Sequence, residues 1–296
     1  MTGLLGVMIF SVSAKMPSFD IYMGDLDIQD SQLKVSHLRA LTNRTGYDNQ
    51  PLFLPDGDSL LYTSAIINNK VEQTDSMFVS FKSGQILNLT NSVESEYSPT
   101  LMPNGENFSV IRATNNEQKL WRYPLHPEQQ SSESASELLA TINPVGYHAW
   151  VDKNRVLLFV LGEPQTLQLA DLREQSSQIL DNNIGPSLFA IPDSPLMSYT
   201  AAIGKGDDIR WRLKSYQPNT GQIKVLTTLP KGAYYYAWAG NGYAIAAVDN
   251  MLMQWDKANA DRGWQPFADV SDKCPKGVTR LSTNSQISKI AIVCTL

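Results

Sequence analysis

YDNQPLFLPDGDSLLYT, residues 47–63, is the stretch that decides the fold. It reads as an extended segment, a tight turn at Pro55-Asp56-Gly57 and a second extended segment. Proline fixes φ at the turn entry, the aspartate side chain bonds backbone amides, and glycine accepts a positive φ. Leucine and tyrosine side chains flank the turn on both sides. The stretch therefore predicts a β-hairpin with one apolar face.

Comparable hairpins recur along the whole chain. Pro103-Asn104-Gly105 stands in residues 97–111 where Pro55-Asp56-Gly57 stood in the first hairpin, and four later hairpins keep the apolar spacing with weaker turn signals. The turn anchors are about 40 to 49 residues apart, which is the period of propeller blades. These anchors are Asp56, Asn104, Lys153, Asp193, Asn241 and Gln286. Each interval holds four short extended runs, enough for one four-stranded blade.

The number of predicted strands indicates how the propeller ring is closed. Five complete blades fit between residues 49 and 270, two N-terminal strands lie at residues 18–26 and 32–41, and a C-terminal hairpin occupies residues 279–293. The two ends together supply a sixth blade, and this closure removes exposed sheet edges. We therefore predict an all-β, six-bladed β-propeller of four-stranded blades, with one blade closed by N- and C-terminal strands. Residues 15–296 form a single domain, and the polar loop 124–134 is an excursion within a blade.

The N-terminus and the cysteines bear on the compartment. Residues 1–14, MTGLLGVMIFSVSA, resemble the end of a secretory signal peptide, although a start codon placed too late and an extra β-strand are alternatives. No apolar stretch is long enough for a transmembrane helix. Cys274 and Cys294, the only cysteines, are expected close together in the last hairpin. A disulfide there would fit an oxidising compartment, but two unpaired thiols are equally compatible with the sequence. We expect a periplasmic or secreted protein.

Composition narrows the classes of partner. The formal net charge is −5, with no basic stripe, which argues against nucleic acid and anionic membranes as partners. Three histidines limit any metal site built mainly from imidazole. No G-x-S-x-G, H-E-x-x-H, Walker A or G-x-G-x-x-G motif is present. We expect a monomer without a cofactor and without a conventional catalytic motif.

The repeat resembles a known family. Residues 47–64 and 96–112 are similar to the TolB-like, WD-type propeller repeat, whose core reads roughly P-x-F-S-P-D-G-x-x-I-x-Y. The resemblance covers nearly the whole chain from Phe19, and longer stretches resemble small secreted propeller proteins. It implies a bacterial six-bladed propeller, often periplasmic or associated with the cell envelope. Because binding proteins and enzymes share this repeat, the resemblance implies no particular activity.

Residues at the start of each first strand are the candidates for a site. In a propeller these strands line the central channel, and concave places where polar groups converge are where ligands bind. The alternative is that these side chains bond channel waters and neighbouring blades. The candidate ligand-binding residues are Asp48, Asn49, Gln50, Glu96, Tyr97, Tyr147, His148, Tyr235, Tyr236 and Arg280.

Two functions follow from these candidates. The first is a non-catalytic exported propeller that binds a protein, peptide or glycan of the cell envelope through its central funnel and top loops. The alternative is a metal-assisted enzyme of lactonase or polysaccharide-lyase type. It would hold a divalent cation in the channel on Asp48, Glu96 and His148, with His148 as acid and base. The lack of catalytic motifs favours the first.

Overall fold

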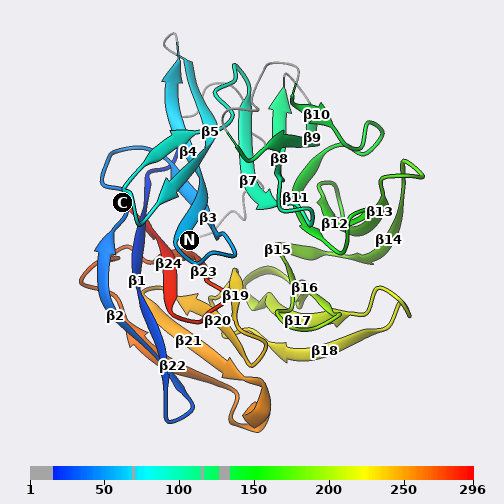
Figure 1. The fold of residues 1–296 in the computed structure, drawn as a ribbon. Helices are drawn as coiled ribbons and strands as arrows, with labels where there is room; N and C mark the ends of the chain where they lie inside the picture. The colour runs from blue at the N-terminus through cyan, green and yellow to red at the C-terminus, as the bar shows by residue number, and fades with distance from the viewer. Residues whose placement is uncertain (1–15, 69–70, 115–116, 127–133) are drawn as a thin grey trace.

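The computed structural model describes residues 16–68, 71–114, 117–126 and 134–296. The expected signal-peptide segment, residues 1–14, and most of the loop 124–134 lie outside these ranges. Six four-stranded antiparallel sheets form a ring, each with its first strand innermost (Figure 1). The predicted six-bladed β-propeller is confirmed. In the described ranges, no helix is long and apolar enough to cross a bilayer.

The blades are numbered in chain order from the first complete one. Blade 1 is β3 (Asp48–Phe53), β4 (Ser59–Asn68), β5 (Val71–Ser80) and β6 (Ile86–Asn88). Blade 2 is β7 (Ser95–Leu101), β8 (Asn107–Thr114), β9 (Glu117–Pro124) and β10 (Ser136–Glu137). Blade 3 is β11 (Val145–Trp150), β12 (Arg155–Val160), β13 (Thr166–Asp171) and β14 (Ser176–Asn182). Blade 4 is β15 (Ile184–Ala190), β16 (Met197–Ile203), β17 (Arg210–Tyr216) and β18 (Ile223–Thr228). Blade 5 is β19 (Tyr236–Ala239), β20 (Tyr243–Val248), β21 (Met251–Asp256) and β22 (Trp264–Asp269).

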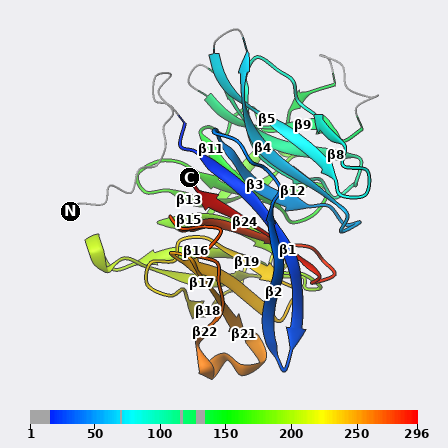
Figure 2. The same ribbon diagram turned by 90° about the vertical axis from the view of Figure 1, so that its left-hand side faces the viewer.

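Blade 6 is made from both ends of the chain, as predicted. It consists of β23 (Val278–Thr283), β24 (Lys289–Thr295), β1 (Phe19–Gln29) and β2 (Gln32–Ala40), in the order β2-β1-β24-β23. Figure 2 shows β1 and β24 side by side, and their register runs from Phe19 opposite Thr295 to Asp25 opposite Lys289. A disulfide joins Cys274 to Cys294 with Cα atoms 5.0 Å apart, which resolves the choice that the sequence left open.

The turn side chains act as predicted. Asp56 Oδ1 accepts hydrogen bonds from the backbone N–H groups of Asp58 and Ser59, and Gly57 has a φ of +70°. Asn104 does the same in blade 2. In blade 3 the carboxylate is that of Asp152, one residue before the expected anchor. These polar groups are fully used by the scaffold, so they belong to no site.

First strands carry an irregularity that matters for the channel. The register of β3 shifts between Asn49 and Leu52, and that of β7 shifts between Tyr97 and Thr100. Gln50 and Ser98, at equivalent positions in these bulges, both have a φ of +56°, a conformation that side chains other than glycine adopt rarely. A bulge re-aims the side chains that follow it. Here it sets which residues face the channel.

Candidate functional site

Two cavities follow one another along the central channel. The larger, called the upper cavity below, has a volume of about 220 Å³, and the smaller, the lower cavity, about 110 Å³. Five residues line both cavities and so form the constriction between them: Gln50, Tyr147, Pro186, Tyr235 and Arg280.

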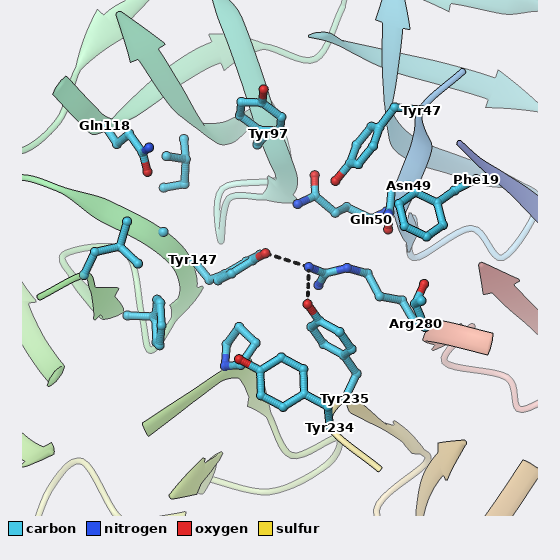
Figure 3. A pocket seen from close by; sticks show the side chains of 16 residues that line it. Phe19, Tyr47, Asn49, Gln50, Tyr97, Gln118, Tyr147, Tyr234, Tyr235 and Arg280 are labelled. Atoms are coloured by element: carbon cyan, nitrogen blue, oxygen red, sulfur yellow. Dashed lines mark hydrogen bonds between the residues drawn. The ribbon is translucent and has the colours of Figure 1, made fainter. Parts of the chain in front are cut away.

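Arg280 is the centre of the constriction. Its Nη2 donates hydrogen bonds to the hydroxyl oxygens of Tyr147, at 2.6 Å, and Tyr235, at 3.2 Å (Figure 3). Its guanidinium carbon also lies 5.0 Å and 4.1 Å from the centres of the same two rings, which is cation–π distance. Because the three residues come from blades 6, 3 and 5, this contact joins distant parts of the ring across the channel.

The electrostatics of the constriction are those of a lone cation among neutral phenols. Burial disfavours the charged guanidinium, but the oxygens of Tyr147 and Tyr235 outweigh it and hold the pKa of Arg280 above its ordinary value. Burial raises the pKa of Tyr235 to about 12, so its phenol stays protonated at neutral pH. Among the described residues, no carboxylate forms an ion pair with Arg280.

The wall of the upper cavity is aromatic. Tyr47 contacts Tyr97 edge to face at 6.4 Å between ring centres, and Phe19 packs on Tyr47 at 5.7 Å. Tyr234 and Tyr235 pack against one another at 4.7 Å. Such rings give a ligand a large contact area at little cost in side-chain freedom.

Eight of the residues predicted from the sequence line a cavity, and other lining residues were not predicted. The upper cavity includes Asn49, Gln50, Tyr97, Tyr147, Tyr235 and Arg280, and the lower cavity adds His148 and Tyr236 to those in the constriction. Tyr47 and Tyr234 were missed although each directly precedes a predicted candidate, and that adjacency was the available signal. Phe19, Gln118 and Thr279 had no comparable signal.

The side chains of Asp48 and Glu96 line neither cavity. Successive side chains of a strand point to opposite faces. Since Asn49 and Tyr97 face the channel, the carboxylates that precede them point into the protein. Asp48 accepts two hydrogen bonds of 2.8 Å from Arg44 and is fully buried. The expected convergence of both carboxylates on the channel is therefore corrected: their place is between strands.

Glu96 lies in a buried polar cluster between blades 1 and 2. Its Oε1 accepts hydrogen bonds from the hydroxyls of Ser92, at 2.6 Å, and Tyr123, at 3.0 Å, and Arg112 Nε lies 3.7 Å away. Burial and the nearby charge of Asp75 raise the pKa of Glu96 to about 7, against the opposing effect of these hydrogen bonds and of the arginine. The carboxyl is therefore partly protonated at neutral pH.

Tyr236 and Trp238 link blade 5 to blade 4. The Tyr236 hydroxyl and Trp238 Nε1 both donate to Ser198 Oγ at 2.8 Å, and the serine hydroxyl donates to the Phe189 carbonyl at 3.3 Å. Every polar atom of this group has a partner, and Tyr236 is almost entirely buried. Tyr236 therefore lines the channel with its ring, while its hydroxyl is already hydrogen-bonded to Ser198.

His148 has the equivalent place between blades 3 and 2. Its Nε2 is 2.6 Å from Ser109 Oγ, which also accepts from Trp150 Nε1 at 2.9 Å and donates to the Thr100 carbonyl at 3.2 Å. Because that donation uses the only serine proton, the proton of the remaining bond belongs on His148 Nε2. Burial lowers the pKa of His148 to about 3, so the ring is neutral.

The residues expected to hold a cation are thus separated. Asp48 is paired with Arg44, Glu96 lies in the cluster between blades 1 and 2, and His148 bonds Ser109. Within the described ranges no group of three or more His, Cys, Asp or Glu side chains is arranged to hold a metal ion.

Comparison with known proteins gives the fold. The sequence matches no protein-family model and no curated protein. Among solved structures, one assigned to TolB from Agrobacterium tumefaciens superimposes with a TM-score of 0.69 at 10% identity, covering 95% of this chain and 99% of that one. TolB from Acinetobacter baumannii gives 0.58 at 10% identity, covering 93% and 63%. An oligogalacturonate lyase in complex with manganese gives 0.54 at 12% identity, covering 92% and 78%. At these identities the likeness establishes a TolB-like propeller fold.

Proposed function

We propose that this chain is an exported, non-catalytic binding protein that takes part of a protein or peptide of the cell envelope into the upper cavity. The observation that carries the proposal is the cavity itself. Tyrosines from several blades surround one half-buried cation there, and polar groups converge on a concave, largely aromatic surface. Binding sites combine these features, and aromatic and arginine side chains dominate the energetics of protein recognition.

The size of the cavity supports a macromolecular ligand. Its volume of about 220 Å³ is below the roughly 300 Å³ at which pockets for whole small molecules begin. It therefore suits one side chain or one chain end of a larger molecule, whose remainder lies on the surrounding loops. We further propose that the protein is periplasmic or secreted and monomeric; the similarity to TolB structures supports the propeller fold on which this rests.

A photo-crosslinking experiment in cells tests the proposal. Gln118 lies at the rim of the upper cavity, so Gln118→p-benzoylphenylalanine should give a discrete adduct with an envelope protein. The matched control is the same substitution at Ile179, which is 57% exposed on the outer strand β14. The adduct should be absent from the control and should be lost when Tyr235→Ala is added. Identical adducts at both positions, or none at the rim, would contradict a binding role for the cavity.

A further inference from the structure

Arg280 differs from Arg44, in the loop before β3, in having no anionic partner. Arg44 donates through Nε and Nη2 to both oxygens of Asp48. Arg280 has only phenols, and among the described residues that line the upper cavity it is the one charged side chain. A cation taken out of water is costly unless a counter-charge or several hydrogen bonds compensate it. The site is therefore incomplete without a negative partner.

Arg280 also has hydrogen bonds left to give. A guanidinium carries five N–H donors. Nη2 uses its two for Tyr147 and Tyr235, and no acceptor for the three on Nε and Nη1 is found in the described part of the chain. The two tyrosine rings also contact the guanidinium, with their centres 4.1 Å and 5.0 Å from its carbon. The remaining donors are consequently fixed in direction before any ligand arrives.

Neighbouring polar groups offer donors as well. The hydroxyl oxygens of Tyr147 and Tyr235 accept from Arg280, and the two hydroxyls also share one hydrogen bond with each other, which leaves one phenol proton to donate. Gln50 Oε1 accepts from the backbone N–H of Ser98, at 2.8 Å, and from the hydroxyl of Thr63, at 2.7 Å. Because the Ser98 amide can only donate, this bond identifies the oxygen, and the Gln50 NH₂ group is left as a donor beside Arg280 (Figure 3). The constriction thus offers further hydrogen-bond donors close to Arg280.

These observations select the chemistry of the ligand. A planar carboxylate accepts up to four hydrogen bonds and pairs with a single guanidinium. One cation balances one negative charge, which matches a carboxylate better than a doubly charged phosphate. The aromatic wall above suits an apolar stem. Long-range electrostatic attraction would not bring an anion to this site, because the whole chain is acidic with a net charge of −5. The anion must therefore be bound by the local groups around Arg280.

We propose that the group entering the upper cavity is a peptide carboxylate, bound by Arg280 with one hydroxyl of the Tyr147–Tyr235 pair and the Gln50 amide. This inference rests on the proposed function and names its ligand class. Two peptide sources share the chemistry, an aspartate or glutamate side chain and a free C-terminus.

Calorimetric titration with a matched pair of small probes tests the chemistry. The wild-type protein should bind 3-phenylpropionate about 10- to 100-fold more tightly than 3-phenylpropanamide, the range expected for a charged hydrogen-bonded partner. Arg280→Gln should abolish the preference for the acid, and Arg280→Lys should restore only part of it because an ammonium lacks the planar fork. Equal binding of acid and amide to the wild-type protein would overturn the proposal, and that comparison needs no variant to fold.

Peptides then separate the two sources. One probe is N-acetyl-Gly-Phe-Asp-Gly-amide, whose only carboxylate is a side chain, and the other is N-acetyl-Gly-Gly-Phe with a free C-terminus. Binding of either one that depends on Arg280 supports the proposal and identifies the source. Binding of trigalacturonate with neither peptide bound would overturn the peptide class. A rim adduct that persists without any carboxylate preference would leave the proposed function standing and refute this inference alone.

Discussion

Replacing Glu96 with glutamine should remove a pH dependence of stability that the buried carboxyl creates. The side chain is fully buried, and its Oε1 accepts from Ser92 and Tyr123. Glutamine keeps that acceptor and has almost the same shape, and it resembles the protonated acid. The substitution therefore isolates the ionisation of Glu96 from its packing.

The magnitude follows from the pKa. Folding raises the pKa of Glu96 from 4.5 to about 7. Between these values the folded protein binds more protons than the unfolded chain, so the unfolding free energy falls as pH rises. At about 1.4 kcal/mol for each pH unit, the loss between pH 4.5 and 7 is about 3 kcal/mol. It is complete above pH 7, and the full contribution is present below pH 4.5.

The assay is urea denaturation followed by tryptophan fluorescence at several pH values from 4.5 to 8.5. The wild-type curve by itself does not isolate Glu96, because His148 also makes stability depend on pH. The pKa of His148 is lowered to about 3, so its contribution to stability is lost as pH falls below 6.5. That slope is opposite to the one from Glu96. Both proteins contain His148, so its effect cancels in the difference between the variant and the wild type. The difference should shift in favour of Glu96→Gln by about 3 kcal/mol from pH 4.5 to 7.5.

Glu106→Gln is the matched control, because it makes the same chemical change on blade 2 at an exposed side chain. The difference between this variant and the wild type should stay flat across the pH range. A flat difference for Glu96→Gln as well would refute the reasoning. It would mean that the cluster between blades 1 and 2 accommodates the ionised carboxylate without cost.

Three further predictions concern polar side chains that join neighbouring segments around the channel. His148 should show no titration between pH 8 and 4 and a proton on Nε2 in ¹⁵N NMR spectra, since burial keeps the ring neutral. Ser198→Ala should lower the unfolding free energy by about 2–4 kcal/mol in denaturant titrations, because it leaves a buried phenol and a buried indole without an acceptor. Arg280→Met should raise the melting temperature, whereas Arg44→Met should lower the unfolding free energy by about 3–5 kcal/mol because it strands a buried carboxylate.

The fold was predictable because its signals are local and periodic. Asp56 and Asn104 bond the backbone within their own turns, so the sequence around each is enough to identify a hairpin. The spacing of such hairpins then fixes the blade, and the count of leftover strands fixes the closure. Even where the third turn departs from the pattern, Asp152 supplies the same bonds one residue earlier.

The site was only partly predictable because it depends on which way single side chains point. Asp48 and Asn49 are adjacent in the sequence, yet one pairs with Arg44 and the other faces the channel. The bulge that follows them, with Gln50 at positive φ, has no distinctive residue such as glycine to mark it. The partner of Asp48 lies in the loop before β3, and nothing in a hairpin pattern reveals that ion pair.

The way the ring closes bears on how the site is made. Arg280 belongs to β23 and Phe19 to β1, so blade 6 brings residues from opposite ends of the chain to the upper cavity. The phenols that bond Arg280 come from blades 3 and 5, and they reach Arg280 only when the ring is closed. A lone cation at this point is unfavourable for folding, and the surrounding sheets must compensate it. Cavity and closure are therefore coupled: the groups around Arg280 come together only in the closed ring, so a ligand bound there would also stabilise the closed propeller.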